Sequence, residues 1–175
     1  MRILTVLAFL QAAVMTTGLA EAKEPAKQSR PNVVLIMTDD QGYGDLGCHG
    51  NPVLKTPNLD LLASQSIRLD DYHASPYCVP SRAALMTGRY ADRTGVHNRL
   101  NPNWFARSDE VMLSNMFKDA GYATGMFGKW HLGDNYPYRP MDRGFDEVLH
   151  HNGGAIGVVN DYWGNKYIND TYYQN

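Results

Sequence analysis

The chain is 175 residues long and nearly balanced in charge, with 18 acidic and 16 basic side chains and a formal net charge of −2 at pH 7. That length is enough for one domain with a core of its own. The charge balance gives no support for a nucleic-acid partner, which usually requires a basic excess, and no later stretch is apolar enough to predict a membrane partner.

The first 22 residues are predicted to be a signal peptide. Arg2 supplies the positive start, residues 3–14 are largely apolar, and Ala20-Glu21-Ala22 is a small-x-small cleavage site. The apolar run is shorter than the ~20 residues that span a bilayer. We therefore expect cleavage near Ala22, a disordered lead-in over residues 23–30, and a secreted or periplasmic protein.

Residues 32–38 predict a strand that is buried on both faces, because four consecutive aliphatic side chains lie between polar ones. Asp39 and Asp40 follow directly, at the strand end where α/β sheets bind ligands. Neighbouring strand residues point to opposite faces, so the two carboxylates can share one ion only if the chain turns there. Such oxygen ligands favour Ca²⁺ or Mg²⁺ over zinc. Two loop aspartates that cap a turn are the alternative.

The next segment reads as scaffold. A helix is predicted over residues 57–66, with Thr56 as its cap and Pro57 as its first residue. A strand is predicted over residues 67–74, which would complete a βαβ unit. The apolar stripe of the helix is expected to comprise Leu59, Leu62 and Ala63.

Cys78 is predicted to lie just before or at the start of a helix. Pro80 suits a first helical turn, residues 81–86 are good helix formers, and Gly88 ends the segment. Backbone N–H groups and the positive dipole end make such a terminus an anion site. Arg82 lies four residues on and can reach the same side. The alternative is a buried Cys78, or one paired with Cys48.

A second helix is predicted over residues 109–120, followed by a strand over residues 122–127. Lys129 and His131 come at the carboxyl end of that strand. Lysine offers a compact charge for an anionic oxygen, and histidine can transfer a proton near neutral pH. Surface residues in a glycine-flanked loop are the alternative. The core candidates of the helix are Val111, Met112, Leu113, Met116 and Phe117.

Three segments together resemble one family. Cys-x-Pro-Ser-Arg at residues 78–82, continued by Ala-Ala-Leu-Met-Thr-Gly-Arg, resembles the signature of the formylglycine-dependent sulfatases of the alkaline-phosphatase-like superfamily. Asp-Asp-Gln-Gly-Tyr-Gly-Asp at residues 39–45 resembles the first metal-binding segment of that family, and residues 121–133 its second signature. The resemblance implies an α/β fold over residues 31–175: the N-terminal part of an alkaline-phosphatase-like sandwich, mostly parallel sheet with flanking helices. Residues 142–146 also resemble the family and are given a structural role.

The resemblance also implies a mechanism for sulfate monoesters, either aryl or carbohydrate sulfates. A formylglycine-generating enzyme would oxidise Cys78 to formylglycine, and a hydroxyl of the hydrated aldehyde would attack sulfur. Asp39, Asp40 and the residue at position 78 would bind the metal, Ca²⁺ or else Mg²⁺. Arg82 and Lys129 would balance the sulfate charge, and His131 would assist the final proton loss. A disulfide between Cys48 and Cys78 would remove the required thiol, so both cysteines are expected to be free.

The resemblance extends only over the front part of the family pattern. Full-length members of the family take two further metal ligands, typically an Asp and an Asn, from a downstream segment, and no such pair with a suitable preceding strand follows His151. The resemblance therefore implies a truncated chain. Asp39, Asp40 and a formylglycine oxygen also fall short of the 6 to 8 oxygens that Ca²⁺ takes. The other functions that the residues leave open are a phosphomonoester or phosphonate hydrolase, a non-catalytic remnant and a disulfide-bonded binding domain. The run His150-His151-Asn152-Gly153-Gly154 could line the pocket, or its histidines could lie in an exposed loop. Asn169-Asp170-Thr171 is a glycosylation sequon.

Overall fold

A computed structural model describes residues 30–96, 105–154, 168 and 171–175. The chain divides into two compact units, Met1–Met37 and Thr38–Asn175, which are considered separately. The predicted signal peptide and the sequon at Asn169 lie outside the described residues. In the part of the chain that the structure describes, no helix combines the length and the apolar character needed to cross a membrane.

The described part of the first unit, residues 30–37, contains neither helix nor strand. Its aliphatic side chains are exposed; Val34 is 82% and Ile36 80% accessible. The prediction of a buried strand over residues 32–38 is therefore wrong for this structure. An aliphatic run indicates a tendency to be buried, but a strand also needs a neighbour to receive its backbone hydrogen bonds. Among the described residues of this unit there is no such neighbour.

The second unit holds all the regular elements that the structure describes. Its α-helices are α1 (Pro57–Ser64), α2 (Cys78–Thr87) and α3 (Leu113–Asp119). Its strands are β1 (Gly125–Lys129), β2 (Glu147–His151) and β3 (Tyr173–Gln174). Short 3-10 helices lie between them: η1 (Tyr43–Asp45), η2 (Gly47–His49), η3 (Ala91–Thr94) and η4 (Pro140–Arg143).

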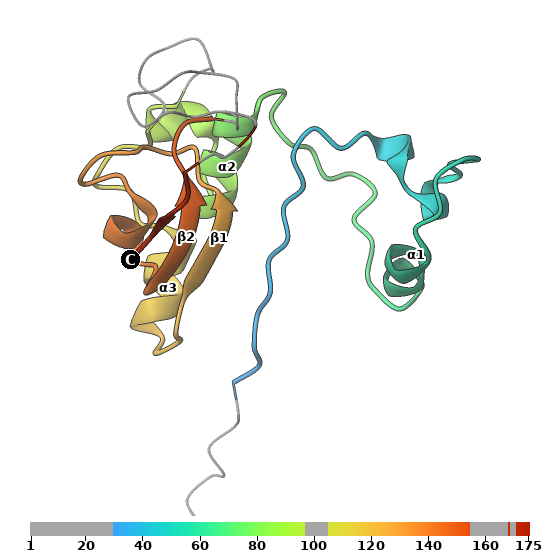
Figure 1. Cartoon of the computed structure of the whole chain (residues 1–175), viewed down its shortest axis with the longest axis horizontal. Coiled ribbons are helices and arrows are strands. Elements are labelled where there is room, and N and C mark those ends of the chain that lie inside the picture. The colour runs from blue at the N-terminus through green and yellow to red at the C-terminus, as the bar shows by residue number, and fades with distance from the viewer. Residues whose placement is uncertain (1–29, 97–104, 155–167, 169–170) are drawn as a thin grey trace, which may run out of the picture. The chain divides into compact units, whose positions relative to one another are not determined.

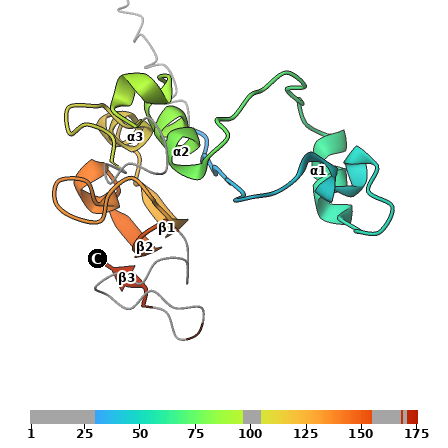
Figure 2. The ribbon, with the colours of Figure 1, turned by 90° about the horizontal axis from the view of Figure 1, so that it is seen from above.

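The three strands form one sheet in the order β1-β2-β3 (Figures 1 and 2). β1 and β2 are parallel and in register from Gly125 opposite Glu147 to Lys129 opposite His151. β3 is antiparallel to β2. Because the parallel strands end together, Lys129 and His151 lie side by side at their carboxyl edge. The parallel pair with adjacent helices agrees with the predicted α/β class.

The core joins α2 to the segment that follows β1. Val79 and Ala83, one helical turn apart, are fully buried and pack with Trp130 and Leu132. Full burial of a side chain the size of Val79 stabilises the fold by about 1.5–3 kcal/mol. The helix ends as predicted at Gly88, whose φ of 65° lets its N–H reach the carbonyl of Ala84 at 2.8 Å. These contacts fix the start of α2 against the end of β1.

α3 begins at Leu113, four residues later than predicted for this helix. The buried guanidinium of Arg143 donates hydrogen bonds to the backbone carbonyls of Arg107, Ser108 and Glu110. Those carbonyls are therefore engaged by a side chain, and the segment before α3, which includes a turn at residues 108–109, is not helical. Met112 is buried as predicted, whereas Val111 and Met116 are about 60% exposed.

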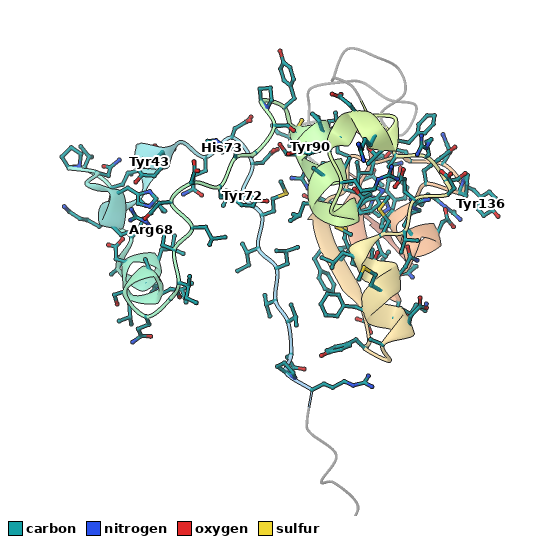
Figure 3. The ribbon with its side chains drawn as sticks, turned by 180° about the vertical axis from the view of Figure 1, so that it is seen from behind. Tyr43, Arg68, Tyr72, His73, Tyr90 and Tyr136 are labelled. Atoms are coloured by element: carbon teal, nitrogen blue, oxygen red, sulfur yellow. The ribbon has the colours of Figure 1, made fainter. Side chains whose placement is uncertain are left out.

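Two scaffold predictions fail in the second unit. α1 forms where expected, but Leu59 and Leu62 of its apolar stripe are 48% and 59% exposed. Residues 67–74 form no strand, so the predicted βαβ unit is not present; the side chains of Tyr72 and His73 lie on the surface (Figure 3). The weak alternation there gave no information on a pairing partner, and none of the described strands pairs with this segment.

Residues 142–146 have the structural role expected of them. Asp142 accepts hydrogen bonds from the backbone and guanidinium of Arg139. Asp146 receives hydrogen bonds from Lys118 and from the backbone of Thr124, just before β1. This segment therefore joins α3, β1 and β2.

Candidate active site

Cys78 is the first residue of α2, and its thiol is free and half-buried. Pro80 is accommodated within the first turn, where its missing N–H breaks no helical hydrogen bond. Cys48 is also free, so the two cysteines are not paired in the structure. Cys78 thus occupies the helix terminus that the sequence predicts, with its thiol available for chemistry.

Arg82 lies one turn further along α2 and is only 9% exposed. Its Nη1 donates a 2.6 Å hydrogen bond to the backbone carbonyl of Lys129, which ties the helix to the end of β1. Burial lowers the pKa of the guanidinium, and the nearby groups of Asp39 and Cys78 oppose that change. Arginine stays charged under these conditions. Its Nε is buried without a hydrogen-bond partner among the described residues.

Lys129, the last residue of β1, forms an ion pair with Asp39. Its Nζ donates a 2.6 Å hydrogen bond to Asp39 Oδ2, and Arg82 Nη2 lies 3.8 Å from Asp39 Oδ1. Burial by itself raises the pKa of the Asp39 carboxyl. The hydrogen bond from Lys129 and the charges of Lys129 and Arg82 outweigh it, so the pKa is lower than usual. One carboxylate is therefore shared by two cations that come from different elements.

Asp40 takes the chain into a turn directly after Asp39. Its φ is 55°, in the left-handed region, and among the described residues only His131 shares this conformation without being glycine. Such backbone values cost energy and often occur at functional sites. Asp40 is nevertheless exposed, and no ion pair within the described part of the chain includes it.

His131 is 7% exposed and follows β1 by two residues. Burial, reinforced by the positive charges of Lys129 and Arg82, lowers the pKa of its imidazole to about 4. The negative charge of Asp39 acts in the opposite direction. The imidazole is therefore neutral near pH 7, and a neutral ring can accept a proton.

The turn after β2 also contacts this site. Gly153 N–H donates to Asp134 Oδ2 at 3.0 Å, which joins the loop after β2 to the loop after β1. Gly154 lies directly on the ring of His131: a Cβ added there would be 2.4 Å from Nε2. His150 and His151 are 2% and 5% exposed, so they are buried strand residues and not the exposed loop residues considered as an alternative.

The sequence identified Gly154 as part of a possible pocket wall, within the run His150-His151-Asn152-Gly153-Gly154, whereas Asp134 was not identified. The signal for Gly154 was the glycine pair beside two histidines, because adjacent glycines permit a close approach of the backbone. What the pair approaches could not be read from the local sequence. The contact partners lie about twenty residues away.

The described residues do not complete a metal site. Asp39 and Asp40 are hard oxygen donors suited to Ca²⁺ or Mg²⁺. Within the described ranges, however, no group of three or more His, Cys, Asp or Glu side chains is placed to hold an ion. Asp39 is moreover the partner of Lys129 and Arg82. Two carboxylates supply at most four oxygens, fewer than the 6 to 8 that Ca²⁺ takes.

The structure thus brings together most of the predicted site residues. Asp39, Arg82 and Lys129 are in direct contact, and His131 and Cys78 interact electrostatically with members of this group. Asp40 is the exception, because it makes no such contact. The cluster combines two fixed cations, a neutral imidazole and a free thiol, which suits the binding and transfer of an anionic group.

Comparisons with known proteins identify the family. The family model described as Sulfatase matches residues 31–174. Mouse steryl-sulfatase is 42% identical over 159 residues, which are 78% of this chain and 26% of that protein. The N-acetylgalactosamine-6-sulfatase of the dog is 40% identical, over 74% of this chain and 26% of that protein. The chain therefore spans about a quarter of the length of these relatives.

Solved structures resemble the fold as well. Ps i-CgsB superposes with a TM-score of 0.71 at 36% identity, over 83% of this chain and 36% of that one. PsFucS1 sulfatase from Pseudoalteromonas sp. gives 0.61 at 36% identity, over 71% and 26%. A protein in complex with its substrate D-glucosamine-2-N,6-O-disulfate gives 0.61 at 32% identity, over 71% and 24%. The fold is accordingly α/β and alkaline-phosphatase-like, and the chain belongs to the sulfatase family.

Proposed function

We propose that this chain carries the nucleophile-bearing and anion-binding part of an enzyme that hydrolyses sulfate monoesters. One observation carries the proposal: Arg82, one turn beyond the free thiol of Cys78, is bonded to the backbone of Lys129. The signature helix and the second signature strand are therefore joined at the residues that would bind sulfate. Membership of the sulfatase family supports the reaction class.

Arg82 and Lys129 are proposed to hold the sulfate oxygens. Both side chains are about 11% exposed, and Arg82 is fixed by a hydrogen bond to the backbone. Cations that are held in place before the reaction need little reorganisation as charge shifts in the transition state, which makes them effective there. In addition, burial of Arg82 strengthens its attraction to an anion.

Cys78 is proposed to be the residue that a formylglycine-generating enzyme oxidises, and the resulting aldehyde would supply the hydrated nucleophile. His131 is proposed to take up a proton as sulfate leaves. Its position against Gly154, which restricts the ring, supports this role. The proton acceptor is thereby held in one orientation.

Three further features belong to the proposal. The substrate class is an aryl or carbohydrate sulfate, which the names of the relatives support. The N-terminal segment is a cleaved signal peptide that directs secretion or export to the periplasm. Asp39, Asp40 and the formylglycine at position 78 contribute oxygens to a calcium site whose remaining ligands come from outside the described residues, with Mg²⁺ as the second choice.

The test compares hydrolysis of 4-nitrophenyl sulfate and 4-nitrophenyl phosphate by the chain produced together with a formylglycine-generating enzyme, with Ca²⁺ present. We expect the sulfate ester to be cleaved faster, and Cys78→Ser to abolish turnover. Cys48→Ser is the matched control, because it removes the other free thiol and should retain activity. Faster cleavage of the phosphate, or sustained turnover by Cys78→Ser, would contradict the proposal.

A further inference from the structure

Asp39 occupies the place of an anion between the two site cations. Its Oδ2 accepts the 2.6 Å hydrogen bond from Lys129 Nζ, and its Oδ1 lies 3.8 Å from Arg82 Nη2. A carboxylate with one oxygen on each cation resembles the way a sulfate or phosphate group would lie there. The pair spans 90 residues of sequence, so it is a tertiary contact and not a local turn.

A second observation indicates that the Asp39 carboxylate does not use all the hydrogen-bond donors of the site. Arg82 is more than nine-tenths buried, and its Nε has no hydrogen-bond partner among the described residues. A buried donor without a partner is costly, and its presence suggests that another acceptor belongs there. The Asp39 carboxylate, at 3.8 Å from Nη2, is too distant for a hydrogen bond to that nitrogen. The Arg82 guanidinium can therefore donate further hydrogen bonds to an anion that has more oxygens than a carboxylate.

We infer that Asp39 is an internal competitor for the anion site: its carboxylate masks Lys129 and Arg82, and sulfate binds more tightly when that carboxylate is removed. This inference rests on the proposed function for the identity of the anion alone. Anything that removes the negative charge of Asp39 should open the site.

The chain itself offers a matched control. Asp39→Asn and Asp40→Asn make the same change in net charge at adjacent positions. Only Asp39 contacts Lys129 and Arg82 in the described structure. Asparagine also tolerates the left-handed backbone of residue 40. A general effect of net charge would appear equally in both variants, whereas removal of the competitor would appear in one.

The experiment is a calorimetric titration of the metal-free full chain with inorganic sulfate at low ionic strength. We expect Asp39→Asn to bind sulfate roughly tenfold more tightly than the unaltered chain, because it removes a negative charge that lies 2.6 Å from Lys129 Nζ and 3.8 Å from Arg82 Nη2. Asp40→Asn should change the affinity less than about twofold, because exposed charges are screened. Asp39→Ala serves as a second variant, since Asn keeps an oxygen that Lys129 can still bind. Circular dichroism verifies that each variant is folded.

The inference is overturned if both Asp39 variants bind sulfate no more tightly than the unaltered chain, or if Asp40→Asn gains as much as they do. Its failure is distinguishable from failure of the proposed function. A chain that hydrolyses no sulfate ester but shows the Asp39-dependent gain supports this inference and contradicts the activity. A chain that hydrolyses sulfate esters without the gain supports the activity and overturns this inference.

Discussion

Replacing Gly154 by alanine should displace the imidazole of His131. A Cβ at this position would lie 2.4 Å from Nε2 and 2.5 Å from Cε1 of the ring, whereas ordinary contacts begin near 3.4 Å. The ring must therefore move by about 1 Å, because Gly154 itself does not need a positive φ and its backbone can keep its conformation. Overpacking of this kind typically costs about 1–3 kcal/mol of stability. A displacement of about 1 Å at a reacting group can cost about 100-fold in rate.

The direct assay is NMR of the Cε1 proton of His131 during a pH titration. In the unaltered chain the pKa is about 4, chiefly because the ring is buried. In Gly154→Ala the resonance should shift and the pKa should rise towards the ordinary value of 6.5, because a displaced ring regains water. Gly44→Ala is the control, since an added Cβ there meets nothing within 4 Å. An unchanged His131 resonance and pKa in Gly154→Ala would refute the reasoning.

Three further predictions concern stability and chemistry. Arg143→Leu should destabilise the fold by about 3–5 kcal/mol in urea unfolding, because three backbone carbonyls lose a charged donor. The control, Arg139→Ala, breaks a half-exposed ion pair and should cost less than about 1 kcal/mol. Equal losses of stability in the two variants would contradict this prediction. The folded pKa of His131 lies below its unfolded value, so its contribution to stability should be complete above pH 6.5 and be lost as the pH falls towards 4, by at most about 3 kcal/mol. His131→Asn, which keeps the left-handed backbone, should flatten that dependence, and an unchanged slope would count against it. Oxidation to the aldehyde, followed with a hydrazide probe, should be absent in Cys78→Ser and present in Cys48→Ser.

Local signals in the sequence predicted the parts of the fold that local chemistry decides. α2 starts at Cys78 and ends at Gly88 because proline suits the first turn and glycine adopts the left-handed cap. β1 and its carboxyl-end loop were located for the same kind of reason, although β1 begins at Gly125 and not at residue 122. The resemblance to a family then indicated which of these positions matter.

The parts that failed depend on contacts between distant segments. Nothing in the run around Val34 specifies which strand would pair with it, and in the structure it lies exposed. The start of α3 depends on Arg143, 30 residues beyond Leu113, which takes the preceding carbonyls. The pairing of Asp39 with Lys129 and the contact of Gly154 with His131 likewise arise only once the chain has folded. Sequence patterns identify such residues as chemically able, but not as partners.

The measurement that addresses the central claim most directly is the mass of the tryptic peptide of residues 69–82, which contains Cys78 but not Cys48. The chain is produced together with a formylglycine-generating enzyme, digested without reducing agent, and analysed by mass spectrometry. The account predicts a peptide lighter than the thiol form by the difference between a thiol and an aldehyde, and reactive towards hydrazides. A peptide found only as the thiol, or linked to the peptide that carries Cys48, would contradict it.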